Sequence, residues 1–191
     1  MNKKNHFDYI ICGGGASGLL LAFRICNAPF FANKSILLIE KEHKDSNDRT
    51  WCFWESNDGD LEQIIHKTWN QSFFASKDFR LDFNLNPYQY KMIRSLDFYQ
   101  FMQQRLKTFS QLTQVTDEVQ KIESNRVTTL KKEYNSDLIF SSILDPKKLF
   151  QQKKYPVLQQ HFLGQIIETK NNCFDPDTVS YTHLRAHETD S

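Results

Sequence analysis

The apolar and polar pattern over the first forty residues predicts a strand, a tight loop, a helix and a second strand. Residues 7–12 are mostly apolar or aromatic and end at a glycine run, which is typical of a buried strand. A largely apolar segment from Ser17 to about Asn27 favours a helix, and Pro29 follows where that helix should have ended. Residues 35–41 again read as a buried strand. Two such strands joined through a helix are expected to be parallel, with a right-handed crossover.

Beyond residue 41, alternating patterns replace the continuous apolar runs and predict a series of shorter elements. In chain order these are a polar loop (41–48), a compact aromatic segment (50–55), a half-exposed strand (79–85), a helix capped by Ser95 and ending near Thr108, two hairpin strands (115–122 and 126–134), a buried strand (137–143), a solvated basic connection (147–154) and a strand-like segment (155–169). Ser124 and Asn125 lie between the hairpin strands as a turn would. The pattern therefore predicts an α/β fold with a parallel sheet and an antiparallel hairpin excursion.

Composition excludes several classes of protein. The 191 residues are 39% hydrophobic and 25% charged, which is typical of a globular chain, and no apolar run approaches the length of a membrane span. The formal net charge of +1 argues against a nucleic-acid partner. Asp8 interrupts the first apolar stretch, so we do not interpret it as a signal peptide. The four cysteines form no C-x-x-C pair, which favours reduced thiols in a cytoplasmic protein, with Cys12 a small buried apolar residue.

The glycine run 13–18, Gly-Gly-Gly-Ala-Ser-Gly, fits the pattern G-x-G-x-x-G between a strand and a helix. Gly13 permits the turn, Gly15 lets the backbone approach a pyrophosphate, and Gly18 lets the helix pack closely. Glu40 ends the second strand, where a carboxylate accepts hydrogen bonds from an adenosine ribose and repels a 2′-phosphate. FAD or NAD is therefore expected rather than NADP. A plain strand–helix turn and a solvated strand-end carboxylate are the alternatives. The predicted cofactor-binding residues are Gly13, Gly14, Gly15, Ala16, Gly18, Glu40 and Arg49.

Residues 47–55, Asn-Asp-Arg-Thr-Trp-Cys-Phe-Trp-Glu, resemble the N-D-R-T-W-C-F-W stretch of bacterial lycopene β-cyclases. Further similarity lies in residues 90–101, 137–143, 158–169 and 174–176, so the resemblance extends over about residues 6–178. It implies a Rossmann-like FAD/NAD(P)-binding domain over residues 1–178, with the start of a substrate region left incomplete. Arg49 either contacts the cofactor, as an arginine does at this place in related flavoprotein folds, or forms a surface ion pair.

The resemblance also implies a chemistry. Members of this family use FAD in its reduced form, kept reduced by NAD(P)H, yet catalyse no net redox change. A carboxylic acid protonates the linear end of lycopene or a related carotene, the carbocation closes a β-ionone ring, and a proton is lost. This requires an acid of raised pKa in a dry apolar cavity, with electron-rich groups beside the cation. The family's acid lies in a glutamate-rich motif that has no counterpart in residues 1–178, so we assign no catalytic residue and interpret Glu168 as a strand-end or structural carboxylate.

Several residues leave two interpretations open. Trp51, Phe53 and Trp54 either line a polyene tunnel or form an ordinary core cluster. The basic group of residues 147–154 is either a solvated face or a peripheral contact with anionic lipid at the inner face of the membrane. His161 is interpreted as structural. A flavin-dependent oxidoreductase, either a hydroxylase or a prenyl-lipid reductase, and a non-catalytic dinucleotide-binding module are the rival functions.

The C-terminal segment has a different origin in our interpretation. Residues 179–191 resemble the in-frame translation of a sequencing-library adapter, so we expect a non-native tail there. His183 and His187 are spaced i, i+4, with Glu188 alongside, as in metal sites on helices, but the tail interpretation removes that reason to expect a metal. The chain is then expected to be an N-terminal fragment that is inactive alone.

Overall fold

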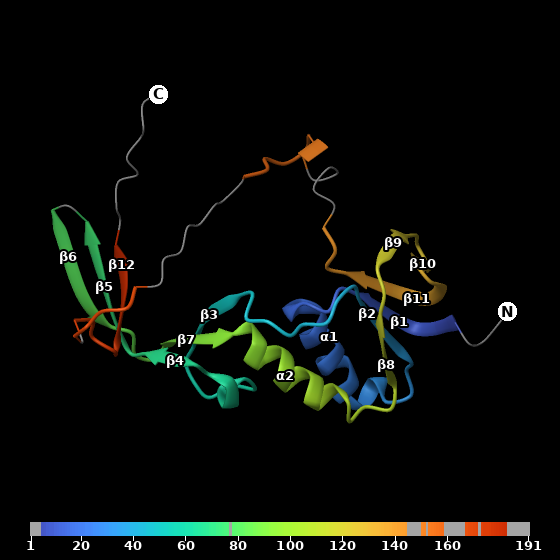
Figure 1. Cartoon of the computed structure of the whole chain (residues 1–191), viewed down its shortest axis with the longest axis horizontal. Coiled ribbons are helices and arrows are strands. Elements are labelled where there is room, and N and C mark those ends of the chain that lie inside the picture. The colour runs from blue at the N-terminus through green and yellow to red at the C-terminus, as the bar shows by residue number, and fades with distance from the viewer. Residues whose placement is uncertain are drawn as a thin grey trace. The chain divides into compact units, whose positions relative to one another are not determined.

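The structure is a computed structural model that describes residues 5–76, 78–144, 150–151, 153–158, 167–171 and 173–182 (Figure 1). The chain divides into two compact units. The first unit combines Met1–Ser46 with Phe98–Phe162, and the second combines Asn47–Asp97 with Leu163–Ser191. Each unit has its own sheet structure, so each is described by itself.

The first unit contains a six-stranded sheet in the order β8-β2-β1-β11-β10-β9. Its strands are β1 (His6–Cys12), β2 (Ile36–Glu40), β8 (Leu112–Thr116), β9 (Val119–Ile122), β10 (Arg126–Thr129) and β11 (Glu133–Ser141). Strands β8, β2, β1 and β11 run parallel to one another. Strand β10 pairs with β11 and with β9 in antiparallel fashion. Helix α1 (Ala16–Asn27) joins β1 to β2, and a short 3₁₀ turn, η2 (Pro29–Phe31), follows it. The predicted parallel sheet with an antiparallel excursion is confirmed.

The core of this unit lies around the central strands β1 and β2. Alternate residues Ile10 and Cys12 pack with Leu37 and Ile39, and the hairpin side contributes Val127. Burial raises the pKa of the Cys12 thiol to about 12, which leaves it protonated and unreactive at neutral pH. The second half of β1 and most of β2 are continuous apolar runs because a parallel strand is covered on both faces. The predicted burial of Cys12 is confirmed.

The predicted hairpin is divided differently from its sequence pattern. Val115 belongs to β8, which pairs with β2, and β9 begins only at Val119. Between them the buried carboxylate of Asp117 accepts a hydrogen bond of 2.6 Å from the hydroxyl of Thr129. The second predicted strand is likewise split into β10 and the first residues of β11. Side-chain hydrogen bonding of a buried aspartate turns the chain where alternation alone predicted continuity.

The second unit contains two small sheets, in the orders β3-β7-β4 and β12-β5-β6. Their strands are β3 (Thr50–Glu55), β4 (Lys67–Trp69), β5 (Gln71–Ser76), β6 (Phe79–Asn84), β7 (Gln89–Arg94) and β12 (Thr178–Thr182). A 3₁₀ turn, η3 (Glu62–Ile64), precedes β4. Helix α2 (Ser95–Leu106) starts at the boundary of this unit and continues in the first. The aromatic segment 50–55 is thus a strand.

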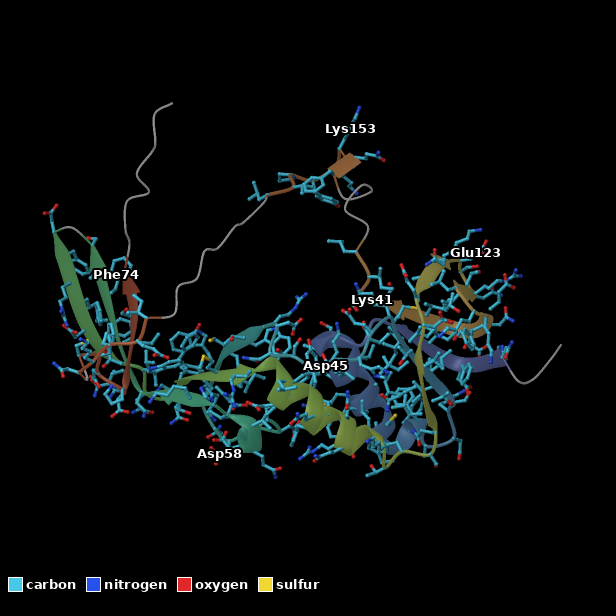
Figure 2. The ribbon with its side chains drawn as sticks, viewed as in Figure 1. Lys41, Asp45, Asp58, Phe74, Glu123 and Lys153 are labelled. Atoms are coloured by element: carbon cyan, nitrogen blue, oxygen red, sulfur yellow. The ribbon has the colours of Figure 1, made fainter. Side chains whose placement is uncertain are left out.

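Strand β6 corrects the prediction of a half-exposed strand, because all six of its residues are exposed. Its cross-strand partner β5 carries Phe74, which is also exposed and is labelled on that strand in Figure 2. The alternation of β6 therefore separates a polar face from an apolar face, and the described residues bury neither of them. Periodicity predicts which residues share a face but does not reveal whether another layer covers that face.

The predictions between residues 147 and 169 fall only partly on described residues. Residues 153–158 and 167–169 form no strand, and Leu158 and Ile167 are exposed, which corrects the strand-like interpretation at those positions. A strand requires backbone partners, and no described strand lies alongside them. His161 and Lys147 lie outside the described residues. Val179–Thr182, the first residues of the expected tail, belong to β12 and pair in parallel with β5. In the described ranges, no helix is long and apolar enough to cross a membrane.

Candidate nucleotide-binding site

The glycine loop of the first unit begins directly after β1. Gly13 has a φ of +105°, in the region that favours glycine. Its N–H donates a 2.8 Å hydrogen bond to the carbonyl oxygen of Ile39 in the neighbouring strand. A Cβ on Gly18 would overlap the carbonyl oxygen of Gly13, so the helix reaches this close to the loop only with glycine there. The turn and the close packing predicted for these two glycines are both present.

The start of α1 leaves room for a ligand. Gly15 is the residue before the helix, and nothing lies within 4 Å of the place that a Cβ on it would occupy. The first hydrogen bond within the helix runs from the N–H of Leu19 to the carbonyl of Gly15. The N–H groups of the preceding turn, from Ala16 to Gly18, have no acceptor inside the helix, and the helix dipole adds positive potential. Open space beside such a helix end suits an anion such as a diphosphate.

Glu40 reaches the glycine loop from the end of β2. Its Oε2 accepts a 2.5 Å hydrogen bond from the N–H of Gly14, and its Oε1 lies 3.6 Å from the Nζ of Lys44. The loop and Glu40 meet because β1 and β2 are adjacent and parallel, so their carboxyl ends share one edge of the sheet. The structure thus brings together Gly13, Gly14, Gly15, Ala16, Gly18 and Glu40.

A cavity of about 400 Å³ adjoins Gly14 and Glu40. Leu19, Leu38 and Val115 line part of it, and polar side chains line other parts, including Lys44, Gln103 and Gln114. These residues come from α1, β2, the loop after β2, α2 and β8, all within the first unit. A mixed polar and apolar cavity beside an anion-binding turn suits the adenosine half of a dinucleotide.

Lys44 contributes a positive charge to this cavity. Burial acts to lower its pKa, but a hydrogen bond to Glu42 and the negative charges of Glu40 and Glu42 outweigh burial and raise the pKa. The ammonium group is therefore present at neutral pH. Sequence reasoning missed Lys44, Gln103 and Gln114 because no motif marks them, and only the tertiary structure brings them to one cavity.

Arg49 belongs to the second unit. Its backbone N–H donates a 3.0 Å hydrogen bond to the hydroxyl of Ser95, the first residue of α2. Its exposed guanidinium lies 3.5 Å from the carboxylate of Asp48. The surface ion pair named as the alternative is the contact present, and a contact with a cofactor stays a prediction.

The aromatic residues of β3 point to two different faces of their sheet. Trp54 lies opposite Tyr90 of β7, which in turn lies opposite Trp69 of β4. The ring centroids are 4.7 Å apart in the first pair and 5.8 Å in the second. Trp51 and Phe53 alternate with Trp54 and are only partly buried. The alternative of one core cluster for these three aromatics is therefore wrong, because alternate side chains of a strand point to opposite faces. The alternative of a polyene tunnel stays a prediction.

A buried lysine on β7 is a feature that sequence reasoning missed. The fully buried side chain of Lys91 lies with its Nζ 2.6 Å from Glu62 and 3.1 Å from Glu55. Burial acts to lower the pKa of Lys91, but hydrogen bonds to Glu62 and Glu55 raise it, so the charge is retained. This ion cluster anchors the segment around η3 to the sheet. Glu168 is exposed and lies in residues 167–169, which form no strand, so its interpretation as a strand-end carboxylate is corrected. The described part of the chain holds no group of three or more residues suited to a metal.

The parallel sheet, the glycine turn and the helix that starts from it define a Rossmann-like fold. The sequence pattern of the family described as lycopene cyclase protein matches residues 8–190, and the chain belongs to that family. No curated protein sequence matches the chain.

Solved structures with the same fold include PqsL, a probable FAD-dependent monooxygenase from Pseudomonas aeruginosa. It has a TM-score of 0.57 and 9% identity over 71% of this chain and 42% of that one. The flavin-dependent brominase Bmp2 has a TM-score of 0.53 and 14% identity over 75% and 39% of the two chains. The C294A mutant of 2-methyl-3-hydroxypyridine-5-carboxylic acid oxygenase has a TM-score of 0.54 and 15% identity, over 72% of this chain and 39% of that one. The chain spans about two fifths of the length of these proteins.

Proposed function

We propose that this chain binds FAD through its glycine loop and Glu40 and is part of an enzyme that cyclises the linear ends of lycopene. The observation that carries the proposal is the approach of Glu40 to Gly14 beside the open start of α1, in a chain of the lycopene cyclase family. The flavoenzymes that share the fold support the choice of FAD.

The first unit supplies three interactions that dinucleotide binding requires. The open turn from Gly15 to Gly18 receives the diphosphate, because its N–H groups and helix dipole favour an anion. The carboxylate of Glu40 accepts hydrogen bonds from the adenosine ribose, and the 400 Å³ cavity beside it receives the adenine. Bound FAD, kept reduced by NAD(P)H, supplies negative charge that stabilises a carbocation.

The reaction we propose involves no net redox change. An acid protonates the linear end of lycopene or a related carotene, the cation closes a six-membered β-ionone ring, and loss of a proton completes the reaction. We assign the acid to no residue of this chain and propose that the chain is inactive alone. We also propose a cytoplasmic protein with a peripheral contact at the membrane that holds the substrate.

Gly15→Ala tests nucleotide binding separately from folding. The added methyl group enters space that is open in the protein but that a bound diphosphate would fill. We expect unchanged stability and at least about a tenfold weaker affinity for FAD, measured by fluorescence titration, because the diphosphate loses its close approach to the backbone. Asn27→Ala, at the exposed far end of the same helix, should leave both unchanged. Equal FAD affinity in the Gly15→Ala variant would refute the assigned site.

Expression, in bacteria that accumulate lycopene, of the full-length enzyme of which we propose this chain is a part tests the reaction. A cyclase produces carotenes with the mass of lycopene and β-ionone rings, whereas a hydroxylase adds oxygen and a reductase adds hydrogen. The monooxygenases that share the fold make a flavin-dependent oxidoreductase the second candidate. Mass spectrometry of the pigments distinguishes them, and FAD binding with no pigment change would favour the non-catalytic module.

A further inference from the structure

The two oxygens of the Glu40 carboxylate have different partners. Oε2 lies 2.5 Å from the backbone N–H of Gly14, and Oε1 lies 3.6 Å from the Nζ of Lys44. An ionised carboxylate has about four lone-pair positions, so both contacts leave acceptor capacity free. The pair of contacts fixes the carboxylate between the glycine loop and the segment that follows β2.

Lys44 is placed for a role in this site and not only at the surface. Its side chain is 19% exposed, close to the 20% of Glu40, and both side chains line the same cavity. Its other contact, 3.0 Å to Glu42, involves a carboxylate that is largely exposed. Lys41 is next to Glu40 in sequence, yet it is 64% exposed and lies 4.0 Å from Glu42 instead (labelled in Figure 2). Of these two lysines, Lys44 therefore faces the candidate ribose position.

We propose that Lys44 is a positioning residue that holds the Glu40 carboxylate in the orientation that binds the ribose hydroxyls of an adenine nucleotide. This inference rests on the proposed nucleotide site. Without Lys44, Glu40 keeps its contact with Gly14 but can rotate its second oxygen away from the cavity. The loss should fall on the ribose hydroxyls and not on the diphosphate, because the glycine loop and the start of α1 do not involve Lys44.

Calorimetric titration of the 191-residue chain with ADP, 2′-deoxy-ADP and 3′-deoxy-ADP tests the proposal. The unmodified chain should bind ADP roughly tenfold or more tightly than at least one deoxy analogue, since a hydrogen bond to a charged group is lost. Lys44→Met should weaken ADP binding about fivefold or more and leave that analogue unchanged, so the preference for the hydroxyl falls. Lys44→Arg should restore much of the preference for the hydroxyl. Lys41→Met should change neither the affinity for ADP nor that for the deoxy analogue.

Each outcome has one meaning. Equal weakening of ADP and of the deoxy analogues by Lys44→Met would show a merely structural role and overturn the inference. Equal binding of ADP and both analogues by the unmodified chain would show that Glu40 does not bind the ribose hydroxyls. That result would also overturn the inference about Lys44, but it would not refute the proposed nucleotide site. No binding of ADP at all would refute the proposed function itself.

Discussion

The two compact units bury their strands in different ways. In the first unit, β1 and β2 lie within a parallel sheet, and Ile10 and Leu37 are completely buried. In the second, every residue of β6 is exposed, and the side chain buried most completely on β7 is that of a lysine. Strands covered on both faces appear in a sequence as continuous apolar runs, whereas small antiparallel sheets depend on pairs across strands. The burial of β1 and β2 is therefore visible in the local run of apolar residues, whereas the burial of Lys91 on β7 depends on carboxylates elsewhere in the chain.

The positions of the tryptophans make this comparison measurable. All three, Trp51, Trp54 and Trp69, lie in strands of the second unit. Tryptophan fluorescence therefore reports unfolding of the second unit, while far-ultraviolet circular dichroism reports both. Both signals can be followed during unfolding in urea.

Lys91→Ala should have the largest effect on stability. The substitution leaves the carboxylates of Glu55 and Glu62 close together without their shared cation. Breaking a buried ion pair costs roughly 3–5 kcal/mol, and because these carboxylates are 30% and 40% exposed we expect about 2–3 kcal/mol. The tryptophan signal should shift by this amount, whereas Lys121→Ala, which removes an exposed pair, should shift neither signal. A loss below about 0.5 kcal/mol would show that the cluster is ordinary surface charge.

Gly18→Ala should destabilise the first unit by about 2 kcal/mol, because its methyl group meets the backbone of Gly13, which cannot move without breaking the turn. The dichroism transition should shift to lower urea while the tryptophan transition stays in place. Coincident shifts of both signals would show instead that the two units unfold as one cooperative structure.

Asp8→Asn should cost about 1 kcal/mol at pH 7 and nothing in strong acid. Hydrogen bonds from Lys34 and Ser35, which directly precede β2, lower the pKa of Asp8 in β1. Because the folded-state pKa is lowered, this stability is fully present above the unfolded pKa of about 3.9 and is lost as the pH falls through the folded value. Unfolding experiments between pH 7 and pH 2 should show the two proteins converging. A pH-independent difference would attribute the loss to packing.

Leu81→Thr should have the smallest effect, within about 0.5 kcal/mol, because Leu81 is already 50% exposed on β6. The same change should reduce binding of the dye ANS, since it interrupts the apolar face that Leu81 shares with Phe79 and Phe83. A loss of more than about 1 kcal/mol would mean that this face is covered in solution and that β6 resembles the strands of the first unit.

Several parts of the site could be read directly from residue order. The glycine run had to form a tight turn because it lies between an apolar strand and an apolar helix, and Gly13 indeed has a positive φ. Glu40 was predicted to end the second strand and therefore to lie beside the loop, since adjacent parallel strands end at the same edge of a sheet. These inferences succeeded because each depends on a few neighbouring residues and one short connection.

Tertiary structure alone decided the rest. It brought Lys44, Gln103 and Gln114 around one cavity, placed Trp54 of β3 beside Tyr90 of β7, and buried Lys91 between carboxylates. These contacts join strands and helices whose order in space differs from their order along the chain. The sequence by itself determined which residues form the turn and the strands that carry it. Which charged side chains face that turn depended on packing between distant elements, because a charge is buried only where a partner of opposite sign comes to meet it.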